Sequence, residues 1–331
     1  MRRWQSRVAN RDMAKTIAFP LLLLCALASY AGDQVPPAAP EHGAESLRIS
    51  VDVSLVVLHA TVTNRQGAFV SNLGAQDFEV RENGVPQTIS LFMNEDVPVT
   101  VGLVIDHSTT MRPKLAEVSA AARTFVRSSN REDEMFVVNF NEKVSLGLPV
   151  AVRFTNSTPQ LEEAIGASQA GGQTALYDAV AKALEELHAG SRDRKVLIVV
   201  SDGGDNASAR NLDAVMKLAG QSSAVIYTLG LFDEDDPDRN PGVLKSLARA
   251  TGGEAFVPKQ LNEVVAICER IARDIRHQYT IGYVPVNPAR DGSYRSIRLA
   301  ARTNGREKLS VRTRTGYIAG SEPRHDEKDA K

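Results

Sequence analysis

Hydrophobic residues follow two different periods along the chain, and the change of period divides it into three regions. From Leu47 to Thr63, apolar residues recur at almost every second position, as in a strand with one buried face. From Val99 to His277, short apolar runs alternate with amphipathic stretches, which predicts strands that alternate with helices. The period of two returns at Gln278. We therefore expect an α/β region between two β segments.

The middle region predicts a doubly wound, Rossmann-like α/β fold with a mostly parallel sheet. The runs at 101–105 and 196–200 are short and continuously apolar, as is typical of central strands that are buried on both faces. Strand, helix and strand then repeat in the order of a doubly wound sheet. Further strands are expected at 134–140, 144–154, 224–231 and 254–257, and helices at 111–125, 176–187 and 261–275.

The two β segments, 47–96 and 278–320, are each too small to bury a core alone. We therefore expect them to join in one small β-sandwich, into which the α/β domain, residues 97–277, is inserted. Asn83-Gly84 is a tight-hairpin signal in the first segment. The second segment is expected to contain strands at 278–283, 296–300 and 309–312.

The first 31 residues predict export. An apolar run at 17–28 is followed by Ser29-Tyr30-Ala31, which offers small residues to a signal peptidase. We expect a signal peptide at 1–31, cut near Ala31 or Gly32, and a secreted or periplasmic, envelope-associated product. The apolar run is too short for a stable membrane span after cleavage. An uncut signal anchor remains the alternative. A lipoprotein attached through Cys25 is disfavoured, because Leu24 precedes it where a small residue is wanted. The basic residues before the run are Arg2, Arg3, Arg7, Arg11 and Lys15.

Composition and charge indicate which segments lack a fold, and they argue against nucleic-acid binding and an internal disulfide. The proline-rich residues 32–46 are expected to form an extended linker, and the charged residues 321–331 a disordered tail. A net charge of −1 gives no general attraction to nucleic acid. Without the signal peptide Cys268 is the only cysteine, so no internal disulfide can form. Its apolar neighbours at helical spacing indicate a buried side chain.

Three short motifs place hydroxyls or carboxylates where buried strands should end. They are Asp106-His107-Ser108-Thr109-Thr110, Gly171-Gly172-Gln173-Thr174 and Ser201-Asp202-Gly203. Ligands of open α/β sheets bind at the carboxyl ends of the strands. Oxygen donors without His or Cys suit a hard divalent cation such as Mg²⁺ or Mn²⁺. The motifs therefore predict a metal site at this edge of the sheet.

Other interpretations of the same residues stay open. The hydroxyls could cap the helices that follow them, and Asp202-Gly203-Gly204 could be a plain turn. Asp205, Asn206 and the acidic run at 233–238 lack the ligand spacing of a calcium loop. They are expected to form a solvated surface loop.

Together the three motifs resemble the metal-ion-dependent adhesion site (MIDAS) of von Willebrand factor type A domains. The resemblance implies five metal ligands, Asp106, Ser108, Thr110, Thr174 and Asp202, with Thr110 where the family usually has Ser. It also implies a bound Mg²⁺, or Mn²⁺ or Ca²⁺, with one open coordination position. An Asp or Glu carboxylate of a protein partner would fill that position.

The resemblance extends to both flanks and suggests a function. The segments 77–80, 279–283 and 316–317 look like those of the exported proteins with a von Willebrand factor type A-related domain that are abundant in acidobacteria. We expect an exported binding or adhesion protein without enzymatic activity. A metal-dependent hydrolase and an assembly subunit with a purely structural cation are the alternatives. The sequence offers a hydrolase no nucleophile beside a His and no second metal cluster.

Export predicts a new N-terminus. Mass spectrometry of protein recovered from the native envelope should find a chain that begins near Gly32 or Asp33. Because Trp4 is the only Trp, the mature chain should also lack Trp fluorescence. An intact Met1 on soluble cytoplasmic protein would reject the prediction.

Overall fold

The computed structural model describes residues 55–232, 238–302 and 309–320. They belong to one compact unit that spans residues 52–331. The expected signal peptide, linker and C-terminal tail lie outside the described residues, as does most of the acidic run at 233–238. Within the described ranges, no helix is long and apolar enough to cross a membrane.

The central sheet has six strands in the order β10-β9-β8-β5-β6-β7. All neighbours pair in parallel except β6 and β7. Every residue of β5 is buried, in agreement with its continuously apolar sequence. The strands are β5 (Val99–Asp106), β6 (Glu134–Phe140), β7 (Val144–Leu146), β8 (Arg194–Ser201), β9 (Val225–Gly230) and β10 (Ala255–Phe256).

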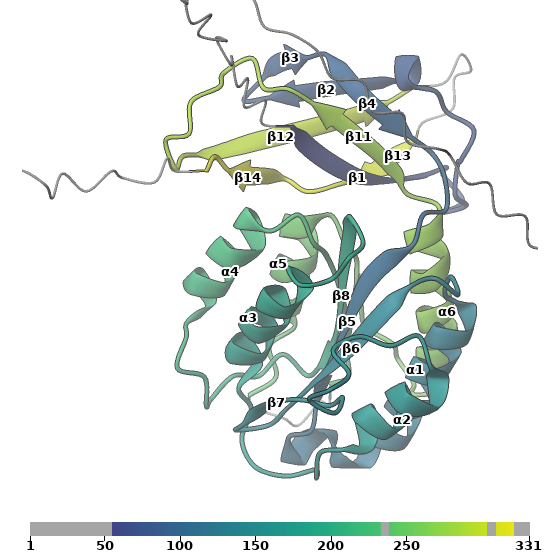
Figure 1. Ribbon diagram of the computed structural model, residues 1–331, viewed down its shortest axis with the longest axis vertical. Coiled ribbons are helices and arrows are strands. Elements are labelled where there is room, and N and C mark those ends of the chain that lie inside the picture. Colours follow the sequence, from purple (N-terminus) through teal and green to yellow (C-terminus); the bar gives the residue numbers. More distant parts are fainter. Residues whose placement is uncertain (1–54, 233–237, 303–308, 321–331) are drawn as a thin grey trace, which may run out of the picture. The chain divides into compact units, whose positions relative to one another are not determined.

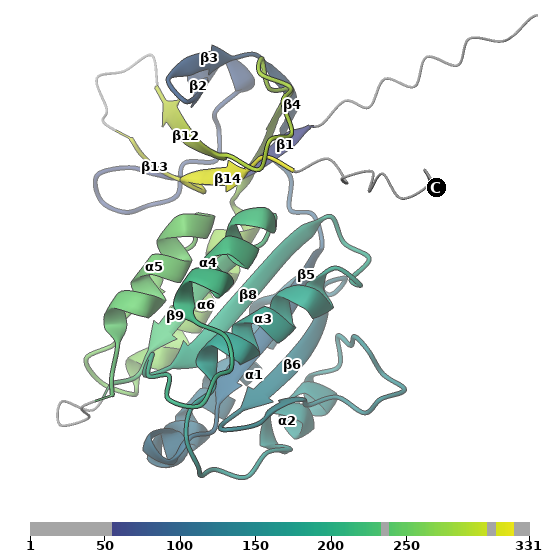
Figure 2. The same cartoon turned by 90° about the vertical axis from the view of Figure 1, so that its left-hand side faces the viewer.

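Helices cover both faces of this sheet (Figure 1). One face is covered by α1 (Leu115–Ser128), α2 (Thr158–Gly166) and α6 (Glu263–Arg276). The other face, turned to the viewer in Figure 2, is covered by α3 (Leu176–Leu187), α4 (Leu212–Gln221) and α5 (Pro241–Thr251). The chain passes from β5 to β6 on one side and later returns to β8 on the other side of β5. The doubly wound prediction is therefore confirmed, and β5 and β8 form its topological switch point.

Some predicted elements differ from the structure. The expected strand at 144–154 ends at Leu146, and beyond it only a single bridge joins Met135 to Thr155. Gly147 and Pro149 interrupt this segment, and a proline cannot donate to a strand ladder. The helices α2, α4 and α5 were not predicted, although Asn211 and Asn240 cap α4 and α5 through their side chains.

The two β flanks form two further sheets of four strands, with orders β13-β1-β11-β4 and β14-β12-β2-β3. Each sheet contains strands from both flanks, and the two share one apolar core that includes Leu58, Val80 and Ile281. The prediction of a sandwich built from both flanks is confirmed. The strands are β1 (Val56–Thr63), β2 (Phe78–Glu82), β3 (Val85–Gln87), β4 (Ile89–Met93), β11 (Tyr279–Tyr283), β12 (Tyr294–Ala301), β13 (Ser310–Arg312) and β14 (Gly316–Ile318).

The hairpin signal is also confirmed. Asn83 and Gly84 join β2 to β3 with φ values of 48° and 83°. Positive φ at both central positions is what a tight hairpin turn needs, and Asn and Gly tolerate it best. The turn thereby fixes the register of β2 against β3.

A buried carboxylate on β2 ties the flanks together. Glu82 accepts hydrogen bonds from the hydroxyls of Tyr283 at 2.8 Å and Tyr317 at 3.0 Å. It also forms an ion pair with Arg295 at 3.2 Å, and the two charged side chains are only 3% and 2% exposed. These partners lie on β11, β14 and β12, so one side chain connects the N-terminal flank to three strands of the C-terminal flank.

A second buried carboxylate joins the sandwich to the α/β domain. Asp274 on α6 accepts hydrogen bonds from Thr61 of β1 at 2.6 Å and from Tyr227 of β9 at 3.0 Å. It is also paired with Arg312 of β13. Because Asp274 is 1% exposed, its charge is stabilised by these partners from both regions and not by water.

Replacing Glu82 with Ala should destabilise the protein by about 3–5 kcal/mol, because Arg295 would keep a buried charge without its partner. Denaturant unfolding followed by circular dichroism measures the change. Glu79→Ala on the same strand is the matched control. Its pairs with Arg81 and Arg302 are partly exposed, so the loss should be below about 1 kcal/mol. Equal losses in the two variants would contradict this role of Glu82.

Candidate metal site at the carboxyl edge of the central sheet

Two carboxylates meet at the switch point of the central sheet. Asp106 is the last residue of β5, and Asp202 directly follows Ser201, the last residue of β8. Since β5 and β8 are neighbouring parallel strands, their carboxyl ends lie side by side. Asp106 is 0% exposed and Asp202 is 2% exposed. The fold therefore removes both side chains from water.

The hydrogen-bond donors to Asp106 are hydroxyl and amide groups. Its Oδ2 accepts a hydrogen bond from Ser201 Oγ at 2.6 Å, and its Oδ1 accepts one from the backbone N–H of Ser108 at 2.8 Å. Burial raises the pKa of Asp106 to about 6, although the hydrogen bonds from Ser201 and Ser108 act in the opposite direction. The nearby Asp202 raises this pKa further.

Asp202 is bound to the first motif by a side-chain hydrogen bond. Thr110 Oγ1 donates to Asp202 Oδ2 at 2.5 Å, and Ser108 Oγ lies 3.1 Å from Thr110 Oγ1. The backbone N–H of Gly204 donates to Asp202 Oδ1 at 3.0 Å. In the described parts of the chain, neither Asp106 nor Asp202 forms an ion pair with a Lys, Arg or His side chain.

The loop that carries Thr174 is held against the first motif by backbone contacts. Both the N–H and the hydroxyl of Thr109 donate to the carbonyl of Gly172, at 3.3 and 3.1 Å. The N–H of Gly171 donates to the carbonyl of His107 at 2.8 Å. These three hydrogen bonds place the second motif beside the first.

Asn206 holds the same loop against the segment that follows Asp202. Its side-chain oxygen accepts from the N–H of Thr174 at 2.9 Å, and its own N–H donates to the Thr174 carbonyl at 3.0 Å. Thr174 is 7% exposed, and its hydroxyl makes no hydrogen bond with any residue that the structure describes. The structure thus joins Asp106, Ser108, Thr110 and Asp202 directly, and Thr174 through its backbone.

The hydroxyls do not serve as helix caps. Ser108 precedes a 3-10 helix at Thr109–Lys114, yet its side chain makes no capping hydrogen bond. The cap position of α3 belongs to Ala175. The first turn of α3 is instead satisfied by Asp205, whose Oδ2 accepts from the N–H of Tyr177 at 2.8 Å. The capping interpretation is therefore wrong for Ser108 and Thr174.

The third motif does turn the chain, as the alternative interpretation expected. Gly203 has a φ of 80° and packs so closely that a Cβ there would lie 2.3 Å from the carbonyl oxygen of Asn240. The turn is what directs Asp202 toward Thr110, so it supports the carboxylate's place in the site.

Sequence reasoning missed three residues that organise the site. Ser201 contacts Asp106 and also accepts from the N–H of Gly203 at 3.0 Å. Asp205 and Asn206 were expected in a solvated loop, and Asn206 is indeed exposed, but both hold the Thr174 segment in place. Ser201 is a polar residue at the end of an apolar strand run, and this position is the signal by which the sequence could have identified it.

The donor set fits a hard divalent cation. In the described ranges there is no group of three or more His, Cys, Asp and Glu side chains that could hold a metal. The carboxylates of Asp106 and Asp202 and the nearby hydroxyls offer oxygen alone, which is the chemistry that Mg²⁺ and Mn²⁺ prefer. The neighbouring His107 bonds Asn139 on β6 at 3.1 Å instead.

A family model identifies this part of the chain. Residues 101–204, which contain all three motifs, match the model of the von Willebrand factor type A domain. These residues are thus similar to von Willebrand factor type A domains. A search of curated proteins finds no match to the sequence.

Several solved structures resemble this chain, but only distantly. A von Willebrand factor type A protein from Catenulispora acidiphila is 14% identical, with a TM-score of 0.47; the similarity covers 82% of this chain and 75% of that chain. The vWF domain of the type V pili tip protein Mfa5 from Porphyromonas gingivalis is 16% identical, with a TM-score of 0.46, over 54% and 95% of the two chains. Proximal thread matrix protein 1 from the mussel byssus, solved with a zinc-occupied MIDAS motif, is 17% identical, with a TM-score of 0.44, over 55% and 48%. Scores this low say nothing about what the present domain binds.

The Ser201 hydroxyl should stabilise the metal-free fold. Ser201→Ala leaves Asp106 Oδ2 and the N–H of Gly203 without their buried partner, so unfolding free energy in chelator should fall by about 1–3 kcal/mol. Urea unfolding measures it. Ser246→Ala removes an exposed hydroxyl that bonds the carbonyl of Gly242 on α5, and it should change stability by less than about 0.5 kcal/mol. If both variants lose the same stability, Ser201 does not organise the site.

Proposed function

We propose that this von Willebrand factor type A domain binds a protein partner through a divalent cation. The cation, Mg²⁺ or Mn²⁺, would be held by Asp106, Ser108, Thr110, Thr174 and Asp202. An Asp or Glu carboxylate of the partner would complete its coordination. The observation that carries the proposal is the pair of buried carboxylates, Asp106 and Asp202, that no basic side chain of the described chain neutralises.

Charge balance supports a divalent ion. A buried carboxylate costs free energy unless it is paired, hydrogen-bonded or bound to a metal. Two carboxylates would neutralise one doubly charged cation, and the hydroxyls of Ser108, Thr110 and Thr174 would add neutral oxygen donors. A monovalent ion would leave a net negative charge at a place where Asp106 and Asp202 are almost fully removed from water.

The number of donors leaves room for a partner. Mg²⁺ prefers octahedral coordination and often retains water ligands. Five side chains would leave a coordination position for a further oxygen ligand. A partner carboxylate suits that position because it is a hard, negatively charged oxygen donor. It would replace a neutral water molecule at the coordination position that the domain does not fill.

The proposed setting is the cell envelope or its exterior. The basic N-terminus, its apolar run and Ser29-Tyr30-Ala31 support export by a signal peptide. An exported protein would meet millimolar-range divalent cations without competition from cytosolic buffers, so a modest affinity would suffice.

Removing the charge of Asp202 should abolish cation binding and leave the fold intact. In Asp202→Asn the amide oxygen can still accept from Thr110, but the second negative charge is gone. For the wild type, Mn²⁺ at about one hundred times its dissociation constant should raise unfolding free energy by about 2.7 kcal/mol. The variant should show almost none of this increase. Thermal unfolding with Mn²⁺ or with chelator, together with titration calorimetry, measures both effects.

Asp213→Asn is the matched control, because Asp213 is an exposed carboxylate in the first turn of α4. It should retain full Mn²⁺ binding. The wild-type protein should then capture its partner from native envelope extract only when the cation is present. Capture should be lost when chelator is added, and it should also be lost with Asp202→Asn. If the wild-type protein binds no divalent cation at millimolar concentration, the proposal is wrong. If cation binding is normal but capture is unchanged by chelator, the cation is structural.

A further inference from the structure

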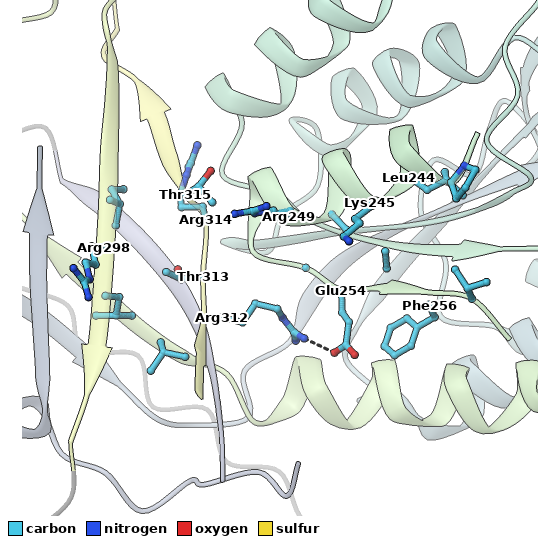
Figure 3. A pocket seen from close by; sticks show the side chains of 18 of the residues that line it. Leu244, Lys245, Arg249, Glu254, Phe256, Arg298, Arg312, Thr313, Arg314 and Thr315 are labelled. Carbon is cyan, nitrogen blue, oxygen red and sulfur yellow. Dashed lines mark hydrogen bonds and ion pairs between the residues drawn. The ribbon is translucent and has the colours of Figure 1, made fainter. Parts of the chain in front are cut away.

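A second candidate site lies away from the carboxylates, along α5. A cavity of about 650 Å³ is lined by α5, by the edge strand β10 and its flanking residues, and by β12, β13 and the segment that follows (Figure 3). None of the five proposed metal ligands lines it. This volume is typical of small-molecule sites. Its apolar wall includes Leu244, Phe256 and Leu299.

Basic side chains dominate the charged lining of the cavity. They come from α5, β12, β13 and the segment after β13, and Figure 3 shows them around the same opening. The carboxylate of Glu254 also lines it, but Glu254 is already bound to Arg312 and, at 3.0 Å, to Arg270. The lining therefore carries a clear excess of positive charge. The basic residues are Lys245, Arg249, Arg298, Arg312 and Arg314.

Among the residues that the structure describes, Lys245, Arg249 and Arg314 have no ion-pair partner. Arg312 is the exception, since it pairs with Glu254 and Asp274. Lys245 and Arg249 are exposed on α5 and form neither a hydrogen bond nor an ion pair with a residue that the structure describes. They stand one helical turn apart, so both can reach a ligand on the same side of α5.

Arg314 is the most informative of the group. Its guanidinium donates to the carbonyls of Gly220 at 2.7 Å and Gly316 at 2.9 Å, but it forms no ion pair with a described carboxylate. Burial lowers the pKa of Arg314, which reflects the cost of keeping its charge away from water. An anion bound in the cavity would offset that cost.

We propose that this cavity binds a small organic anion, with a carboxylate, phosphate or sulfate group on an apolar body. The anionic group would lie among Lys245, Arg249 and Arg314, and the apolar body would pack on Phe256 and Leu299. Charge complementarity and the volume of the cavity support a small molecule. An acidic peptide segment would satisfy the same charges, so the experiment includes one as a competing ligand.

The probe is anilinonaphthalene sulfonate, which joins one sulfonate to an apolar aromatic body and becomes fluorescent when it leaves water. The full chain is titrated in chelator at about 0.15 M salt, where surface attraction is largely screened. We expect saturable binding of one probe per chain. Phenylnaphthylamine, the same aromatic body without the sulfonate, should bind at least about tenfold more weakly, the effect of losing one good charged contact.

Arg249→Ala and Lys245→Ala should each weaken sulfonate-probe binding by up to about tenfold. Neither should affect phenylnaphthylamine, and circular dichroism should confirm an unchanged fold because both residues are exposed. Lys217→Ala, which removes an exposed lysine of the neighbouring α4, should leave both probes unaffected. Asp202→Asn should also bind the probe normally, which separates this site from the proposed metal site.

Three results would overturn the proposal. The first is sulfonate-probe binding that Arg249→Ala and Lys245→Ala leave unchanged. The second is equal affinity for the charged and the neutral probe, which would mean that apolar contact alone drives binding. The third is a labelled glutamate-rich peptide that binds and depends on Arg249 while the sulfonate probe does not bind. In that case the cavity is part of a protein docking surface.

Discussion

The structure depends most on the placement of two negative charges at the end of a buried sheet. Asp106 and Asp202 are almost fully buried, and only hydroxyl and amide donors contact them. Elsewhere in the described chain, the buried carboxylates of Glu82 and Asp274 have the arginine partners Arg295 and Arg312, whereas the buried Asp133 accepts hydrogen bonds from two backbone N–H groups. The switch point between β5 and β8 thus keeps an uncompensated charge that is costly in the metal-free protein. The divalent cation that we propose for this site would offset that cost.

The parallel sheet is what makes this arrangement possible. Three loops from distant parts of the sequence reach one edge because β5 and β8 run side by side and the hydrogen bonds of Thr109 and Asn206 hold the Thr174 loop between them. The polar contacts inside the site are short and directional, whereas the strands beneath it are held by apolar packing. Changes to the hydroxyls of Ser108, Thr110 and Thr174 should therefore leave the apolar core intact, since different side chains form the two.

Much of this could be predicted from the sequence. The continuously apolar runs that end at Asp106 and Ser201 identified the central strands, and the oxygen-bearing residues after them identified the site, because both signals are local. The sequence predicted that the two short β flanks would pack together, but not the order of their strands. Strands from both flanks mix in each sheet, and this arrangement depends on long-range contacts such as those of Glu82 with Tyr283 and Tyr317. The roles of Asn206 and Asp205 were missed because an exposed loop residue shows no hydrophobic period. The cavity beside α5 was missed because Arg249 and Arg314, which are far apart in the sequence, line the same cavity only in the folded chain.

The interleaving of the flanks has a consequence for the order in which the protein can form. β4 and β11 are hydrogen-bonded neighbours, with Met93 opposite Thr280, yet the entire α/β domain separates them in the sequence. During synthesis, β1 to β4 therefore emerge long before the strands that complete their sheets. Non-local pairing of this kind slows folding and leaves strand edges exposed in the interval. Residues 56–93 are thus the part of the chain for which a chaperone, or rapid folding of the α/β domain, would matter most.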